Sequence, residues 1–221
     1  LASLVYLFLV GFQGAWNPLV MKEYRDPGAE KRFKTVFNYF VFVTAAILVV
    51  ISLFGRGILL LVTTRAFSEG YIVVPLLTAS AVLASVGNYF TYGIQIAERT
   101  HVRMVINILG LLVNVVLNIV FIRWIGLIGA ALATFTSYVL IAVPTMIMSQ
   151  RYYRVPYEWG RVFAVFLIAM TIANLPLLYS FKLSLAVIAA KLVVAALAVA
   201  IMGKLLRIAG VRAVIAALRG R

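Results

Sequence analysis

Residues 104–148 read MVINILGLLVNVVLNIVFIRWIGLIGAALATFTSYVLIAVPTMIM, and Arg123 is the only charged side chain among them. A helix needs about 20 predominantly apolar residues to cross the hydrocarbon core of a bilayer. The segment is long enough for two such helices, over 104–123 and 127–148, joined by the short connector 124–126. It therefore predicts two membrane-spanning helices that fold back on each other.

The rest of the chain has the same apolar character. It is 65% hydrophobic and 12% charged, with a mean hydropathy of +1.09, which leaves too little polar surface to coat a water-soluble globule. The apolar runs are continuous, whereas the strands of a membrane β-barrel alternate in polarity. We expect an all-α integral membrane protein with about seven helices. The seven windows long enough to span are 1–21, 35–53, 72–97, 104–123, 127–148, 162–180 and 183–202.

The basic residues predict which side of the membrane each loop faces. Fifteen of the 20 Lys and Arg residues fall in segments 22–34, 98–103, 149–161 and 203–221, which alternate with connectors holding four. Short loops rich in Lys and Arg stay in the cytoplasm, so we expect these segments and the C-terminus there. The net charge of +14 is then an orientation signal that also attracts anionic membrane lipids, and it does not indicate nucleic acid.

Composition also limits the chemistry. The chain has no cysteine and a single histidine, His101, so we expect no metal site and no cofactor. No nucleophile motif, phosphate loop or pair of intramembrane carboxylates occurs in the sequence, and we do not expect an enzyme. The chain begins at Leu1 without an initiator Met, so we expect it to be part of something longer.

Several local features predict how the helices begin and end. Asp26-Pro27-Gly28 predicts a turn followed by a helix start, and Pro18 predicts a kink in the first span. The second span either ends near residue 53, before a short interfacial helix, or continues tilted to residue 62. Apolar residues at helical spacing predict that 203–221 forms a basic amphipathic helix on the cytoplasmic leaflet.

Polar residues form stripes along three of the predicted spans. Gln13 and Asn17 share a face of the first span. The third carries Ser85, Asn88, Thr91 and Gln95, and the fourth carries Asn107, Asn114 and Asn118. Such stripes must face other helices or water. Small residues four apart, at 129, 133 and 137, predict that the fourth and fifth spans pack closely as a hairpin.

Five residues are candidates for binding a substrate. Lys191 lies well inside a span, where a charge costs about 3 kcal/mol, so it is a site hypothesis unless its stem reaches an interface. Gln13, Asn17, Asn88 and Gln95 could offer hydrogen bonds to a sugar. The alternative for such amides is to join helices, which we favour for Asn114 and Asn118. We expect Glu98, Arg99 and Arg103 to form an interfacial charge group without a catalytic role.

The segment 107–118 (NILGLLVNVVLN), followed by 126–134 (GLIGAALAT) and Ser137-Tyr138, resembles the Wzx-like polysaccharide flippases. These belong to the superfamily of multidrug, oligosaccharidyl-lipid and polysaccharide exporters. Residues 13–18 (QGAWNP) and the basic loop after them are similar to the start of that family's second bundle.

The resemblance implies a transporter of twelve to fourteen helices in two lobes around a central cavity. By this reading 1–148 is five helices of the C-terminal lobe, 149–202 adds two helices, and 203–221 is a cytoplasmic tail. The implied substrate is an undecaprenyl-pyrophosphate-linked oligosaccharide, flipped by alternating access across a bacterial or archaeal cytoplasmic membrane. Other polysaccharide-assembly membrane proteins are implied as partners.

Three other functions remain open. A multidrug extruder should show an acidic residue facing its cavity, and a lipid II flippase would use similar chemistry to the leading interpretation. A membrane-embedded glycosyltransferase or ligase should show an acidic or histidine constellation, or a large extracytoplasmic loop, and the sequence contains neither.

Overall fold

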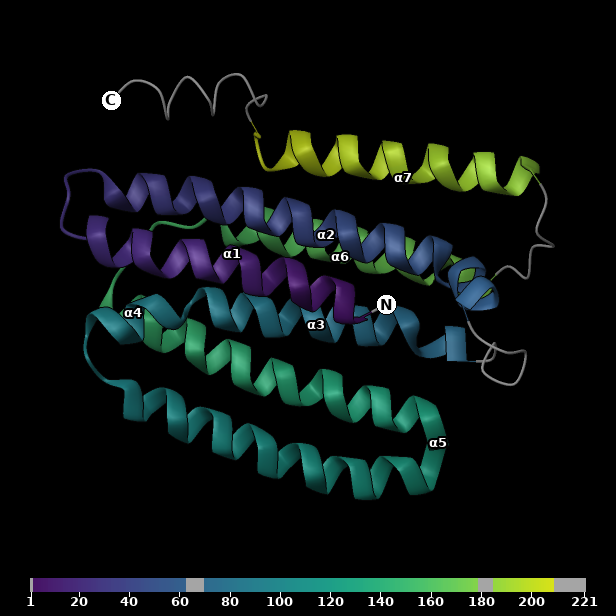
Figure 1. Cartoon of the computed structure of the whole chain (residues 1–221), viewed down its shortest axis with the longest axis horizontal. Helices are drawn as coiled ribbons and strands as arrows, with labels where there is room; N and C mark the ends of the chain where they lie inside the picture. Colours follow the sequence, from purple (N-terminus) through teal and green to yellow (C-terminus); the bar gives the residue numbers. More distant parts are fainter. Residues whose placement is uncertain (1, 63–69, 179–184, 209–221) are drawn as a thin grey trace.

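The computed structural model of the chain describes residues 2–62, 70–178 and 185–208, and within these ranges it contains helices and no strands (Figure 1). The helices are α1 (Ala2–Glu23), α2 (Ala29–Val62), α3 (Val74–Tyr89), α4 (Thr91–Ile96), α5 (Thr100–Tyr152), α6 (Trp159–Leu178) and α7 (Leu185–Leu205). They run roughly parallel or antiparallel to a common axis (Figure 1).

Among the described residues, five helical segments are long and apolar enough to cross a membrane. They are Ala29–Gly55, Gly70–Ile96, Thr100–Tyr152, Trp159–Pro176 and Val187–Leu205. The second of these includes both α3 and α4, and the third is counted once although α5 folds back on itself. This arrangement agrees with the predicted all-α membrane class, while the predicted number of about seven spanning helices is not confirmed.

Helix α5 is a hairpin whose turn is built at two residues. Ile125 (φ −133°, ψ 18°) and Gly126 (φ 58°, ψ −131°) leave the helical conformation, and the positive φ of Gly126 suits a residue without a Cβ. The limbs 100–124 and 127–152 then lie side by side (Figure 1). A Cβ at Gly110 would overlap the side chain of Ile141 across the hairpin. The predicted close-packed hairpin over 104–148 is confirmed.

The third predicted span differs from expectation because it is broken. At Phe90 (φ −76°, ψ 1°) the chain makes a turn, so that α3 ends at Tyr89 and α4 begins at Thr91. The turn directs Tyr92 into the core, and it brings Gly93 against Ser149 so closely that a Cβ at position 93 would overlap it. The stripe from Ser85 to Gln95 is therefore divided between two helices.

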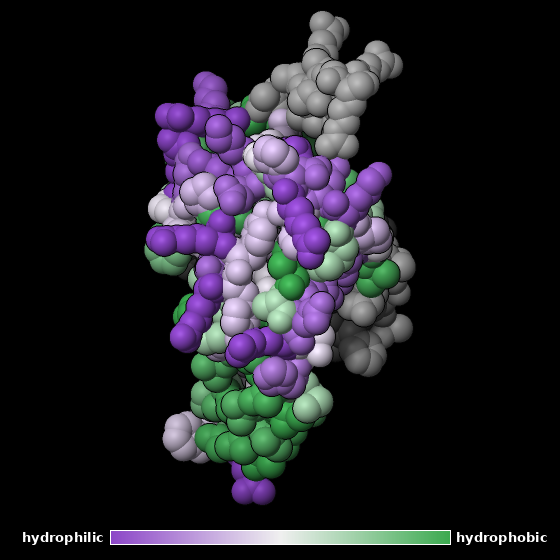
Figure 2. All heavy atoms as spheres, turned by 90° about the vertical axis from the view of Figure 1, so that its left-hand side faces the viewer, coloured by the Kyte–Doolittle hydropathy of each residue, from purple (hydrophilic) through white to green (hydrophobic). Residues whose placement is uncertain are grey.

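The basic segments gather at one end of the bundle, on the left in Figure 1, and Figure 2 shows that this end is largely hydrophilic. The Tyr153 hydroxyl donates to the Tyr24 carbonyl at 3.0 Å, and the Asn38 amide donates to the Leu206 carbonyl at 3.5 Å. The first bond joins the segment after α5 to the α1–α2 loop, and the second joins α2 to the end of α7. The predicted alternation of basic and less basic connectors thus corresponds to two ends of the structure.

Aromatic side chains from several helices pack together at this end. Trp16 stacks on Tyr89 with ring centroids 4.9 Å apart, and Phe37 packs against Tyr157 at 4.6 Å. The Tyr92 and Tyr157 hydroxyls share a hydrogen bond of 2.7 Å. Burial raises the pKa of the Tyr157 hydroxyl well above its usual value, so it remains a neutral partner.

The local predictions have mixed outcomes. The turn at 26–28 is confirmed, with Gly28 at φ 80° and Ala29 beginning α2. Helix α1 continues through Pro18 to Glu23, and α2 continues to Val62, the longer of its two predicted ends. The described part of the tail leaves the helix after Leu205, since Arg207 adopts φ 51°. The amphipathic helix was predicted over 203–221, and its residues from 209 onward lie outside the described ones.

Candidate functional site

A polar cavity of about 510 Å³ lies between α1, α3 and both limbs of α5. Amide, hydroxyl and guanidinium groups supply its polar surface, and no carboxylate is among the described residues that line it. The residues around it are Val10, Gln13, Leu77, Ser80, Ala81, Ala84, Ser85, Asn88, Arg103, Asn107, Thr134, Tyr138 and Ile141. A hollow of this size and mixed lining is typical of sites for small ligands or parts of larger ones.

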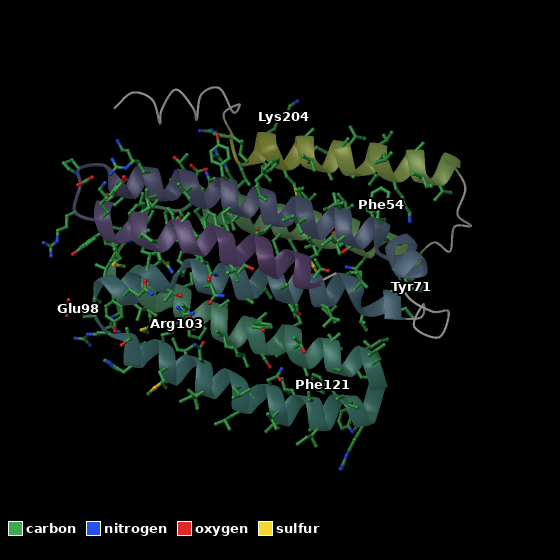
Figure 3. The ribbon with its side chains drawn as sticks, in the orientation of Figure 1. Phe54, Tyr71, Glu98, Arg103, Phe121 and Lys204 are labelled. Carbon is green, nitrogen blue, oxygen red and sulfur yellow. The ribbon has the colours of Figure 1, made fainter. Side chains whose placement is uncertain are left out.

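The charged group of the polar cavity is Arg103, in the first turns of α5. Its Nη2 donates to the Asn88 Oδ1 of α3 at 2.9 Å, a charge-assisted hydrogen bond. Figure 3 shows Arg103 at the basic end of the hairpin, near the α3–α4 break. A guanidinium has five N–H donors, so a ligand can bind this group while Asn88 holds it in place.

The serine and threonine hydroxyl groups of the cavity have partners inside their own helices. The Ser80 hydroxyl donates to the Leu76 carbonyl at 2.8 Å, and the Thr134 hydroxyl donates to the Ala130 carbonyl at 2.9 Å. Their protons are thus occupied, while the oxygen lone pairs can still accept. The cavity therefore offers hydroxyl acceptors together with amide and guanidinium donors.

The structure brings only some of the predicted candidates together. Gln13 and Asn88 both line the polar cavity, which neither the first span nor the third could form alone. Asn17 is half-buried one turn further along α1, and Gln95 is half-buried on α4, and neither lines the cavity. The cavity is thus built by fewer of the predicted amides than the stripes suggested.

Lys191 lies outside the cavity, on α7. Its Nζ donates to the Leu53 carbonyl of α2 at 2.8 Å. The bond gives this intramembrane cation a partner in the neighbouring helix, and α7 does not contribute to the cavity lining. Lys191 and the amides of the cavity therefore belong to different parts of the bundle.

For two groups of polar residues the described contacts differ from those that the sequence predicted. Asn118 donates from Nδ2 to Oδ1 of Asn114 at 3.1 Å, so their described hydrogen bond lies within one helix and does not join two. Arg103 was expected at the interface with Glu98 and Arg99, yet it is partly buried and faces the cavity. Its spacing of four from Asn107 places both on one face of α5, and this was the signal that could have identified it.

In the described part of the chain, no group of three or more His, Cys, Asp and Glu residues is placed so that it could hold a metal ion. Fold and site together define an all-helical protein with membrane-length helices and a polar cavity inside the bundle. No protein-family model, no curated protein and no solved structure matches the chain.

Proposed function

We propose that this chain forms one lobe of a transporter that moves a lipid-linked oligosaccharide across a cytoplasmic membrane by alternating access, for polysaccharide biosynthesis. The observation that carries the proposal is the polar cavity, with Arg103 held by Asn88 among neutral hydrogen-bonding groups. Sugars require many donors and acceptors, and the pyrophosphate of an undecaprenyl carrier requires a cation. The cavity supplies both.

The volume of the cavity and the number of membrane crossings fit one lobe of a two-lobe transporter. About 510 Å³ is room for a drug-sized ligand, so a repeat unit of several sugars would also extend against a second lobe. In this proposal α1, α2, α3 with α4, the two limbs of α5, α6 and α7 are seven crossings. The basic end then faces the cytoplasm by the positive-inside rule.

The absence of carboxylates from the described cavity lining distinguishes the competing transporters. A multidrug extruder that exports cations needs a negative or neutral aromatic site, and a guanidinium repels such substrates. A lipid II flippase carries the same pyrophosphate and sugar chemistry, and it stays the second candidate.

Binding by the whole chain in nanodiscs tests the proposal. A short-chain polyprenyl diphosphate carrying a disaccharide should bind, and Arg103→Gln should weaken binding roughly ten- to hundredfold, because it removes a charged hydrogen-bond donor. Arg103→Lys should retain part of the affinity, since it keeps the charge but loses the planar fork. The same variants should slow translocation of a fluorescent lipid-linked sugar in proteoliposomes.

Arg99→Gln is the matched control, because Arg99 is an exposed arginine at the same end that packs over the Tyr152 ring at 5.6 Å and lines no part of the cavity. Equal loss of affinity in the two glutamine variants would contradict a role for the cavity. Tighter binding of a cationic dye than of the diphosphate sugar would favour the multidrug extruder instead.

A further inference from the structure

A second hollow lies on the opposite face of α3, and we call it the apolar groove. It has a volume of about 580 Å³ and is lined by α2, α3, the second limb of α5 and α6. Thr44 supplies the one hydroxyl among the described lining residues of the groove, and this hydroxyl donates to the Phe40 carbonyl at 2.8 Å. Phe163 is 63% exposed and Val143 is 42% exposed, so the groove opens on the outside of the bundle. All four helices belong to segments of membrane-spanning length, so we expect this outer face to meet lipid.

A cationic cluster stands at one end of the groove. Lys34 Nζ lies 2.6 Å from Glu158 Oε1, Arg161 pairs with the other oxygen of the same carboxylate, and Arg207 also acts on it electrostatically. The hydrogen bond from Lys34, with the charges of all three cations, holds the pKa of Glu158 below its ordinary value. Three cations around one ionised carboxylate leave a surplus of positive charge.

The cluster and the groove share the same two helices. Along α2, Lys34 precedes the groove residues Phe37 and Val41 at helical spacing, so these side chains lie on one face. With a rise of 1.5 Å per residue, the groove begins about 5 Å from the lysine along the axis. On α6, Arg161 lies between two groove residues, Gly160 and Val162.

An aromatic residue marks the boundary between the two. Trp159 begins α6, lines the groove and is 38% exposed. Tryptophan is enriched at the level of lipid head groups, where its ring packs on apolar chains and its N–H reaches water. The site thus passes from charged groups through an aromatic residue to an apolar groove, an order that matches the phosphate, the glycerol backbone and the acyl chain of a phospholipid.

We propose that the apolar groove binds one anionic phospholipid, with an acyl chain between α2 and α6 and its phosphate on Lys34 and Arg161. A soluble anion would leave the groove empty, and a zwitterionic lipid would not use the surplus charge. This site is separate from the polar cavity and does not depend on the proposed transport function. The tight contact of Gly87 with Ala142, where a Cβ would lie 3.3 Å from the Ala142 Cα, closes off one hollow from the other.

Native mass spectrometry of the whole chain in detergent, with added phosphatidylglycerol or phosphatidylcholine of the same chains, tests the site. We expect one phosphatidylglycerol to stay bound preferentially. Each cation near a membrane surface contributes about fivefold to such binding, so Lys34→Gln with Arg161→Gln should reduce retention by more than tenfold. Lys22→Gln with Lys31→Gln removes two exposed charges from the same end and should change little. Glu158→Gln should raise retention, which a merely structural ion pair would not do.

The groove itself is tested by filling it. A Cβ at Gly160 meets no atom within 4 Å, so Gly160→Leu should fold and displace the acyl chain, whereas Gly14→Leu on α1 has equally open space away from the groove. Equal retention of the two lipids overturns the proposal, as does equal loss in the paired control variants. Competition by glycerol phosphate at the same concentration would indicate a plain anion site, and a groove covered by a second copy, seen as a dimer without lipid, would also overturn it.

Discussion

The polar cavity and the apolar groove have similar volumes and share a wall, yet their linings are opposite in polarity. On α3, Ser80, Ser85 and Asn88 face the cavity, while Val82, Leu83 and Val86 face the groove. On α5, the neighbours Ile141 and Ala142 line different hollows. Much of the outer surface of this bundle is apolar. The difference in polarity that separates two ligand classes therefore lies between the two sides of one helix, α3.

In the two proposals, this difference in lining decides which ligand each hollow binds. A cavity with a guanidinium and amides binds a polar group at depth, because unpaired polar groups are costly in an apolar medium. In our proposal the groove, which has no charged side chain among its described lining residues, binds hydrocarbon, and its mouth selects for charge. A variant designed for one hollow should therefore change ligand binding there and leave ligand binding in the other hollow unchanged.

Breaking the wall between the hollows should have the largest effect. Gly87→Val adds atoms where even a Cβ would lie 3.3 Å from the Ala142 backbone, so α3 and α5 must separate. We expect a loss of roughly 1–3 kcal/mol in the free energy of unfolding, as for other overpacked interiors. Thermal unfolding in detergent measures it, with Gly160→Ala as the control in open space. Unfolding temperatures that match for the two variants would show that the wall is not closely packed.

Removing the acceptor of Arg103 should have the next largest effect, confined to the polar cavity. Asn88→Ala leaves the guanidinium without its 2.9 Å partner, which costs about 1–3 kcal/mol for a buried group and less where water reaches it. A double-mutant cycle with Arg103→Gln measures the coupling between them. Strictly additive losses would mean that the two side chains do not act together, and lipid retention by the groove should be unchanged in either variant.

The sequence predicted more of the fold than of the site. Apolar length and basic loops were sufficient to predict the all-helical membrane class, the hairpin over 104–148 and the gathering of charge at one end. Helical periodicity could place Asn88 and Gln13 on interior faces, but it could not show that α1 and α3 meet at one cavity. The break at Phe90 and the inward course of Arg103 depend on contacts with α5, and such tertiary contacts leave no signal in local spacing.

Neutralising Lys191 should have a smaller effect and should spare both hollows. Lys191→Met removes the bond to the Leu53 carbonyl at 2.8 Å but also removes a charge from the middle of a membrane helix, so the two changes in stability oppose each other. We expect a shift within about 1 kcal/mol. Binding of the diphosphate sugar and retention of phosphatidylglycerol, measured as above, should both equal those of the unaltered chain. A marked loss of sugar binding would instead assign Lys191 to the substrate-binding site, as the sequence alone suggested.

The smallest effect should come from acid, at the mouth of the apolar groove. The pKa of Glu158 lies below its ordinary value of 4.5, so its ion pairs stabilise the folded chain above that pH and are lost as the pH falls through the lowered value. Because these groups are solvent-accessible, the contribution is small. Glu158→Gln should therefore unfold at a slightly lower temperature than the unaltered chain at neutral pH, and the gap should close on acidification below 4.5. If the difference in unfolding temperature between Glu158→Gln and the unaltered chain persists in acid, the stabilising interaction does not depend on the charge of the carboxylate.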